Sequence, residues 1–293
     1  MSTQRILVAL DGSRLAEAVL PAACSLAQRL PARLLLLHVI ERQPPQSVHG
    51  EPHLTMEDEA QLYLDAHAER LRSQQVEVAV HVHQRQVADV AAAIDRHAHE
   101  FDAGLIAMCA HGRTNLRHRL MGSIAERILR GGSIPILLRT ARHADSGEFR
   151  LRHLLVPIDF GHDVDAALDA TRLLAAPYQA TVTLLSVPEP GSPATRRLLP
   201  SASALAHELD REDLHRQLGD LAAKLRADLP DVRTLVLDQK PADAILETAT
   251  SLPADLIVLV TDAHGGVAAW YDPSIAQRLL ARPDLTLLLI KEL

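Results

Sequence analysis

Aromatic residues are scarce in this chain, which has three Phe, three Tyr and one Trp, or 2% of its 293 residues. Its hydrophobic core must therefore be aliphatic, built from Leu, Val, Ile and Ala. The chain is 47% hydrophobic and 23% charged, which is typical of globular proteins. Its length is enough for about two domains of ordinary size.

Several other features are missing, and each absence excludes a class of protein. The apolar runs have the length of strands, far below the roughly 20 residues that cross a bilayer, so we expect no membrane segment. The N-terminal sequence MSTQRILVALDGS lacks the pattern of a signal peptide. Two cysteines, Cys24 and Cys109, do not make a disulfide framework, so the expected location is the reducing cytoplasm. The net charge of −7 at pH 7 argues against a general nucleic-acid binder.

The chain repeats itself, because segments of its first half recur in the same order at an offset of about 150 residues. The matching pairs are 6–13 with 154–161, 34–41 with 181–189, 87–94 with 241–248, 101–112 with 253–265, and 123–129 with 274–280. This self-similarity indicates a duplicated domain. We predict one domain over 1–141, a second over 151–293, and a linker at 142–150, within the polar segment TARHADSGEFR.

Within each half, apolar runs of strand length alternate with helical patterns. In the first half the predicted strands cover 4–10, 33–39, 76–83, 103–109 and 134–139, and the predicted helices cover 14–30, 55–74, 87–99 and 122–130. The strands are apolar throughout, as expected when helices cover both faces of a parallel sheet. The pattern therefore predicts a doubly wound α/β fold with right-handed crossovers. Pro21 should kink the first helix, and Pro31 fits its end.

Ligands of such folds bind beyond the carboxyl ends of the strands, at the point where the strand order reverses. Asp11 ends the first predicted strand, and residues 108–112 end the fourth. If these two strands are neighbours, the two segments line one crevice. The end of the second strand, with His38, Val39 and Ile40, would then form a side wall.

The connection after the fourth strand could hold an anion. The nine residues RTNLRHRLM between Gly112 and Gly122 include Arg113, Arg117, His118 and Arg119. Gly122 and Ser123 begin a predicted helix, whose N-terminus offers free backbone N–H groups and a partial positive charge. The alternative is that this Gly-Ser pair only caps the helix and that the arginines are solvated surface charges. The spacing matches neither a Walker motif nor a G-x-G-x-x-G fingerprint.

With LVALDGS, LLLLHVIE, MCAHGRTNL and LMGSIAERIL in its first half, the chain resembles the universal stress protein family, with two domains in tandem. The resemblance covers nearly the whole chain and is specific in the first half. It implies two Rossmann-like, adenine nucleotide alpha hydrolase-like domains, each with a five-stranded parallel sheet flanked by helices. It also implies a binding and signalling module of the stress response rather than an enzyme.

Family members that bind ATP are known for a Gly-x-x-Gly-x9-Gly-Ser/Thr motif. Here Gly112, Gly122 and Ser123 match it, and Cys109 stands at the first glycine position. In such relatives the Asp that ends strand one and the Val that ends strand two flank the adenine, while the last Gly-Ser and the next residue hold the phosphates. The resemblance therefore implies a nucleotide site made of Asp11, Val39, Met108, Cys109, Gly112, Arg113, Gly122, Ser123 and Ile124. The implied ligand is ATP, with or without Mg²⁺.

The second half departs from this motif. The residues that still match are Asp159, Val187, His264 and Gly265. Pro273 stands where the last glycine should be, and Pro removes a backbone N–H that would face the phosphate. The connection has no Lys or Arg and carries Asp272, which disfavours an anion. We therefore predict no nucleotide in the second domain, where Trp270 and Tyr271 either pack over the crevice or an interface or make ordinary loop contacts.

Other candidate sites are weaker. His81 and His83 share one face of a predicted strand and could ligate zinc, but no convergent third ligand is visible, so a surface pair is favoured. His97 and His99 do not share a helical face and are predicted to lie on the helix surface. Cys109 is either a reactive thiol at a strand end or a buried, inert cysteine. No Ser-His-Asp or Cys-His arrangement has a recognisable spacing.

Three functions remain open. The first is a universal stress response protein that binds ATP or a related adenine nucleotide in its first domain. The second is a non-nucleotide tandem stress protein that acts as a protein-interaction or small-ligand-binding module. The third is slow ATP hydrolysis at the first site. The expected partners are an adenine nucleotide and other proteins, with no nucleic acid and no membrane.

Members of the family pair two domains through their last strands. In this chain, residues 285–290 could lie beside residues 134–139 and make the chain an internal pseudo-dimer. A further pairing of the same kind between two chains would make a homodimer.

Overall fold

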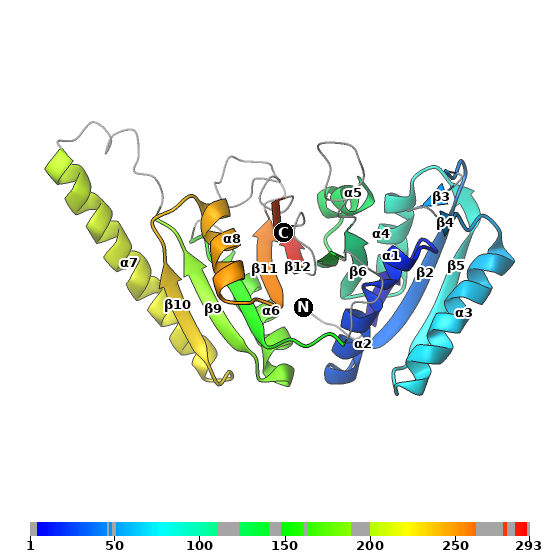
Figure 1. The fold of residues 1–293 in the computed structure, drawn as a ribbon, viewed down its shortest axis with the longest axis horizontal. Helices are drawn as coiled ribbons and strands as arrows, with labels where there is room; N and C mark the ends of the chain where they lie inside the picture. The colour runs from blue at the N-terminus through cyan, green and yellow to red at the C-terminus, as the bar shows by residue number, and fades with distance from the viewer. Residues whose placement is uncertain are drawn as a thin grey trace. The chain divides into compact units, whose positions relative to one another are not determined.

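The computed structural model describes residues 5–45, 47–48, 51–110, 123–140, 148–160, 163–188, 200–261, 278–279 and 285–291. These residues form two compact units (Figure 1). The first unit holds the described residues up to 150 together with the last strand, and the second holds those from 151 to 260.

The first unit is built on a mostly parallel sheet. Its strands are β1 (Arg5–Ala9), β2 (Arg33–Glu41), β5 (Val78–Val87), β6 (Leu105–Ala110), β7 (Ile136–Thr140) and β12 (Thr286–Lys291). Their order is β12-β7-β6-β1-β2-β5, and all neighbouring pairs are parallel except β12 with β7. Two short strands, β3 (Ser47–Val48) and β4 (Glu51–Pro52), pair separately. The five strands predicted from the first half are therefore confirmed.

Five helices connect these strands. They are α1 (Arg14–Glu17), α2 (Leu20–Arg29), α3 (Glu57–Ser73), α4 (Val90–Glu100) and α5 (Ser123–Gly131). The α3 helix lies along β2 and β5, and α4 contacts β2 and α5 (Figure 1). A parallel sheet covered by helices explains why its strands are apolar along their whole length.

Local sequence decides where these helices begin and end. Ser13 and Asp89 are the N-caps of α1 and α4, and each side chain accepts a hydrogen bond from the backbone N–H three residues later. Pro21 lies in the first turn of α2, where its missing N–H costs little. The predicted kink is therefore a full break between α1 and α2, and α2 ends two residues before Pro31.

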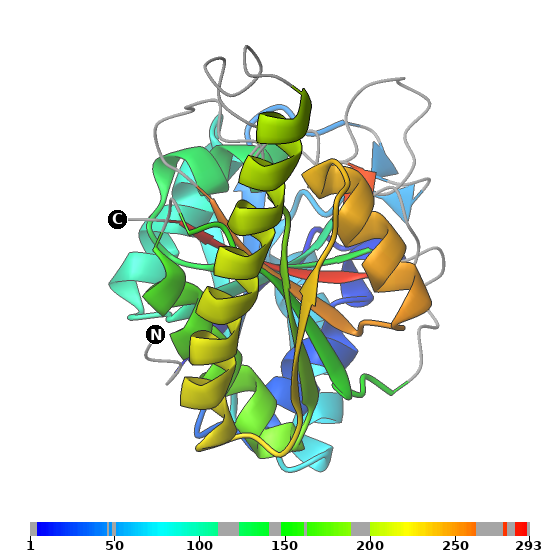
Figure 2. The same ribbon diagram turned by 90° about the vertical axis from the view of Figure 1, so that its left-hand side faces the viewer.

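The second unit repeats the same plan with four parallel strands. They are β8 (His153–Pro157), β9 (Thr181–Ser186), β10 (Val232–Val236) and β11 (Leu256–Thr261), in the order β10-β9-β8-β11. The helices are α6 (Val164–Ala175), the 3-10 turn η1 (Ala176–Tyr178), α7 (Pro200–Arg226) and α8 (Pro241–Ser251). The long α7 helix runs along β9 and β10 (Figure 2).

The duplication extends to individual hydrogen bonds. The bond from Leu10 N–H to Leu37 O (2.9 Å) is equivalent to the bond from Ile158 N–H to Leu185 O (2.7 Å). In the same way, the bond from Arg72 Nη2 to Val78 O (2.8 Å) is equivalent to the bond from Arg226 Nη2 to Val232 O (2.7 Å). The first pair of bonds joins the backbones of neighbouring strands and fixes their register, so positions of the two halves can be matched one to one.

The last strand of the chain belongs to the first unit. In the antiparallel β12–β7 pair, Leu288 lies opposite Leu137. Thr140 fixes this register with its side chain, because its Oγ1 donates to the backbone oxygen of Leu285 (3.1 Å) and accepts from the backbone N–H of Leu285 (2.9 Å). These strands fall in the segments 134–139 and 285–290, for which the sequence suggested pairing.

The core of both units is aliphatic, as the composition predicts. Leu7, Leu36 and Ile106 in the first unit and Leu154 and Val258 in the second are fully buried. In the described part of the chain, no helix is both long enough and apolar enough to span a membrane.

A partly buried carboxylate joins α1 to α3. Glu17 Oε1 lies 3.2 Å from Nε2 of His67, whose Nδ1 accepts a hydrogen bond from Arg70 (2.9 Å). Burial by itself would raise the pKa of Glu17, but the hydrogen bond from His67, together with the charge of Arg70, holds that pKa below its usual value. The contact therefore stabilises the folded protein fully when the pH is above the pKa of Glu in the unfolded chain. This stabilisation is lost as the pH falls through the lower pKa of Glu17 in the folded protein.

Replacing Glu17 with Gln should lower the melting temperature at pH 7 and have little effect near pH 3. Because Glu17 is partly exposed, we expect a loss of about 1 kcal/mol, or roughly 2–4 °C. Thermal unfolding of both proteins at the two pH values measures this. Glu148→Gln, which removes an exposed pair with Arg150, is the control and should leave the melting temperature unchanged. An equal loss for Glu17→Gln at both pH values would contradict the assignment.

Candidate functional site

The strand order reverses between β1 and β6. Both β2 and β6 pair in parallel with β1, so the carboxyl ends of these three strands lie next to one another. Asp11 and Met108 can line one crevice only if the first and fourth strands of this half are neighbours. The pairing of β1 with β6 meets this condition. Ligands of open α/β sheets bind at such a reversal point.

Asp11 organises the turn that leaves β1. Its Oδ1 accepts hydrogen bonds from the backbone N–H of Ser13 (2.9 Å) and from the Ser13 hydroxyl (2.6 Å). Ser13 Oγ in turn accepts from the backbone N–H of Ala16 (3.1 Å). The carboxylate is partly exposed, so it shapes the turn and still reaches the surface at the carboxyl end of the sheet.

Three backbone donors at the start of α1 already have partners within the protein. Its early backbone donors, on Ser13, Arg14 and Ala16, are bonded to side-chain oxygens of Asp11, Glu51 and Ser13 respectively. The Glu51 carboxylate also pairs with the Arg14 guanidinium. A phosphate at this end of the sheet would therefore need another helix N-terminus.

His38 ties the ends of β1 and β2 to the segment that follows β4. It is 1% exposed, and its Nδ1 lies 2.8 Å from the backbone oxygen of Leu10. Its Nε2 lies 3.3 Å from the backbone oxygen of Leu54. Burial lowers the pKa of His38 against the opposing effect of these two oxygens. A neutral ring with its proton on Nδ1 would donate the shorter bond, so His38 is a fixed part of the side wall.

The other predicted residues of these strands are buried. Val39 is 5% exposed, Met108 is 7% exposed and Cys109 is 3% exposed. Cys109 packs against Ala18, with Leu15 beside it, so its side chain points into the core under α1. Of the two alternatives for Cys109, the structure shows the buried one.

The predicted helix after the motif is present, since α5 begins at Ser123. Ile124 is partly buried in its first turn. Gly112, Arg113 and Gly122 lie outside the described residues, as do Arg117, His118, Arg119 and the side chain of Ser123. Their roles stay predictions.

The second half keeps part of the arrangement. Asp159 again follows the first strand of its half, and Val187 is 5% exposed at the end of β9. Ser186 takes the place of His38, because its hydroxyl donates to the backbone oxygen of Ile158 (3.0 Å) as His38 bonds to that of Leu10. His264, Gly265, Trp270, Tyr271, Asp272 and Pro273 lie outside the described residues.

Comparison with known families decides what this fold is. The model of the universal stress protein family matches the chain twice, over residues 2–138 and 150–291. The chain belongs to this family. The predicted tandem of universal stress protein domains is thereby confirmed, while the boundaries at 141, 142, 150 and 151 stay predictions.

Solved structures agree with this fold. A universal stress protein from Archaeoglobus fulgidus is similar over 99% of both chains, with 17% identity and a TM-score of 0.71. A putative universal stress protein from Pseudomonas aeruginosa is similar over 99% of this chain and 94% of its own, with 17% identity and a TM-score of 0.67. The cytoplasmic domain of a prokaryotic cation chloride cotransporter shares the fold over 98% of this chain and 95% of its own, with 14% identity and a TM-score of 0.56.

These likenesses establish the fold and leave the ligand open, because one fold serves many functions. The sequence has no significant match among curated proteins. The function of this universal stress protein must therefore be argued from its own residues.

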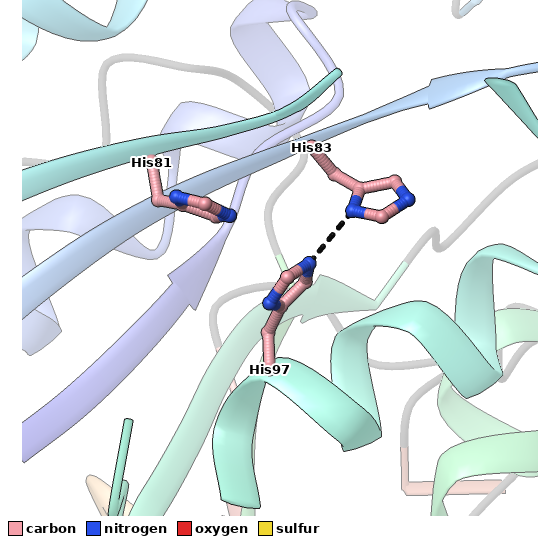
Figure 3. Close-up of side chains that lie close together, drawn as sticks. All are labelled: His81, His83 and His97. Atoms are coloured by element: carbon pink, nitrogen blue, oxygen red, sulfur yellow. Dashed lines mark hydrogen bonds between the residues drawn. The ribbon is translucent and has the colours of Figure 1, made fainter. Parts of the chain in front are cut away.

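The structure also corrects one prediction about the histidines of this universal stress protein. His97 is 5% exposed and lies beside His81 and His83, whereas the sequence placed it on the helix surface (Figure 3). The predicted surface pair on β5 therefore has a third member. The alternating positions on β5 were visible in the sequence, but only the packing of α4 against the sheet brings His97 to them. His99, which was also predicted to be exposed, has a side chain that is 52% exposed.

Proposed function

We propose that this universal stress protein binds ATP or a related adenine nucleotide in its first domain and acts as a stress-response and signalling module. The observation that carries the proposal is the arrangement at the carboxyl ends of β1, β2 and β6. Asp11 follows β1, Val39 lies near the carboxyl end of the neighbouring β2, and α5 begins after the connection that leaves β6. The α1 N-terminus is occupied by side chains, so α5 is the helix of this site that is left for phosphate.

Charge supports the same location. The chain carries a net charge of −7, yet the connection that precedes α5 contains Arg113, Arg117 and Arg119 and no acidic residue. Cations beside a helix N-terminus favour a polyphosphate through both charge and hydrogen bonding. Adenine would lie nearer Asp11 and Val39, in keeping with the family motif.

Cys109 is the departure from the motif that the proposal must accommodate. Its side chain is packed against Ala18 in the core, so the substitution for glycine is absorbed on the core side of β6. The backbone at this position could then approach a ligand without interference from that thiol.

The second domain is proposed to hold no nucleotide. Pro273 replaces the last motif glycine, and Asp272 adds negative charge in a connection that lacks Lys and Arg. One nucleotide per chain is therefore the expected stoichiometry.

Mass spectrometry of the small molecules released when freshly purified protein is denatured tests this stoichiometry. We expect ATP or ADP near one equivalent per chain. With stripped protein, ATP at about 100 times its dissociation constant should stabilise the first domain by about 2.7 kcal/mol, measured by thermal unfolding with and without Mg²⁺. No nucleotide and no shift would refute the proposal, and two equivalents would refute the exclusion of the second domain.

Gly122→Val should abolish nucleotide binding, because a branched side chain at the start of α5 would block close approach of phosphate to the backbone. The control is Gly265→Val in the second half, at the position equivalent to Gly112, which should leave the stoichiometry unchanged. Circular dichroism of the ligand-free variants checks that both fold. If Gly122→Val binds ATP as tightly as the parent protein, the phosphate position is wrong.

A second function is favoured if nucleotide is absent. Cys109 in the motif and the altered second half would then indicate a protein-interaction or small-ligand module. Slow ATP hydrolysis is the enzyme alternative, and a Mg²⁺-dependent turnover that is lost in an Asp11 variant would establish it. A cytoplasmic location stays a prediction from cysteine usage.

A further inference from the structure

Three imidazole rings meet on the first unit, away from the carboxyl ends of β1 and β6. His81 and His83 project from the same side of β5, two residues apart, and His97 reaches them from α4 (Figure 3). One nitrogen from each ring lies within 4.8 Å of the others. Three convergent neutral nitrogens are the donor set that divalent zinc-like ions prefer.

The spacing is close to that of a bound ion. His97 Nε2 lies 2.8 Å from His83 Nδ1. Two nitrogens that share a zinc ion at about 2.0–2.1 Å in tetrahedral geometry lie about 3.3–3.4 Å apart. A small outward rotation of the partly exposed His83 ring, with its proton moved from Nδ1 to Nε2, would therefore replace the hydrogen bond with two metal bonds. The His81 and His97 rings are already in edge contact, with their centroids 4.6 Å apart.

A carboxylate sets the protonation of the central ring. His97 Nδ1 lies 2.9 Å from Oε2 of Glu100, and an ionised carboxylate only accepts hydrogen bonds. The proton of neutral His97 therefore sits on Nδ1, and the lone pair on Nε2 faces His83. Carboxylate–histidine–metal arrangements of this kind orient the ligand ring and strengthen its basicity.

The second half provides an internal comparison. The strand registers match His81 and His83 with Leu235 and Leu237. The helix burial patterns match His97 with Thr248, which shifts the pairing of 87–94 with 241–248 seen in the sequence by three positions. The same fold therefore forms in this chain without imidazole at any of the three positions. Packing alone does not require the cluster.

The surroundings of the cluster leave one side of it open to solvent. His81 and His83 are partly exposed, so water can complete the coordination. Phe101 packs edge-on against His81, with ring centroids 5.0 Å apart, and limits its rotation. Arg85 and Arg96, which face His83, are exposed, so solvent screens their opposition to a cation.

We propose that His81, His83 and His97 form a three-histidine site for a divalent zinc-class metal ion, with Glu100 as the positioning residue for His97. The site lies on the strand next to β2, where His83 pairs with Val39 of the proposed nucleotide crevice.

Zinc titration of the chelator-stripped full-length protein tests the site, with a chromogenic chelator as competitor. We expect one tight equivalent of Zn²⁺ per chain. The variant His81→Leu/His83→Leu and the variant His97→Thr introduce the residues of the second half and should each weaken this site by more than about 100-fold. Glu100→Gln should weaken it by about 10- to 100-fold through loss of the outer carboxylate. His99→Ala, an exposed change on the same helix, should leave the affinity unchanged.

Absorption of the Co²⁺-loaded protein provides a second measurement, since the ligand-field bands report the donor set. These bands should be present in the parent protein and in His99→Ala and absent in the double Leu variant. If His97→Thr does not fold, the double variant decides, because its changes are on the more exposed strand. Absence of a tight zinc equivalent in the parent protein, or the same affinity in the double variant, would overturn the proposal.

Discussion

Leu288→Asp is expected to unfold the first unit at room temperature or to destabilise it by more than about 4 kcal/mol. Leu288 is fully buried and lies in β12, opposite Leu137 of β7. A carboxylate there would lose its hydration without gaining a partner. The substitution lies near the C-terminus, yet it would destabilise a unit whose other strands end by residue 140.

Hydrogen exchange measured by mass spectrometry can localise this effect. Peptides from β6 and β7 should exchange faster in the Leu288 variant than in the parent protein. Leu62→Asp is the matched control, since Leu62 lies on α3 of the same unit and is 71% exposed. The role given to β12 is wrong if β7 keeps its protection in Leu288→Asp.

Gly12→Ala should destabilise the protein by about 2–4 kcal/mol, from the combined cost of its backbone conformation and of overpacking. Gly12 has φ of +89°, a region that favours glycine, and a Cβ there would lie 2.7 Å from two side-chain atoms of Leu54. Since Gly12 joins Asp11 to the cap of α1, the strain falls on the turn that shapes the proposed nucleotide crevice.

Urea denaturation of four variants, namely Gly12→Ala, Leu54→Ala, their combination and Gly219→Ala, separates the two costs. Gly219→Ala is the control, because Gly219 lies within α7, and an added Cβ there meets nothing within 4 Å. We expect this change to raise the stability by up to about 1 kcal/mol. Adding Leu54→Ala to Gly12→Ala should cost less than the sum of the two single changes, because it relieves the contact. If the double variant loses as much stability as the two single variants together, the Leu54 side chain does not restrict position 12.

The sequence by itself determined the duplication, the fold class and most of the secondary structure. Hydrophobic runs of strand length and helical periodicity are local properties, so they can be recognised in the sequence before the fold is known. Pro21 and Pro31 acted locally in the same way, and the helices begin or end near them. The choice of Asp11 and Val39 also came from sequence, since both follow directly from strand ends and from the family motif.

Only the tertiary structure decided which of these ends meet. The order of the strands, which puts β1 between β2 and β6, depends on long-range packing that no local pattern records. The same is true of Glu51, which closes the start of α1 from a segment 37 residues away. His97 was misplaced because the face that a helix buries depends on the sheet it packs against. A site made of side chains from separate elements exists only once those elements have been packed together.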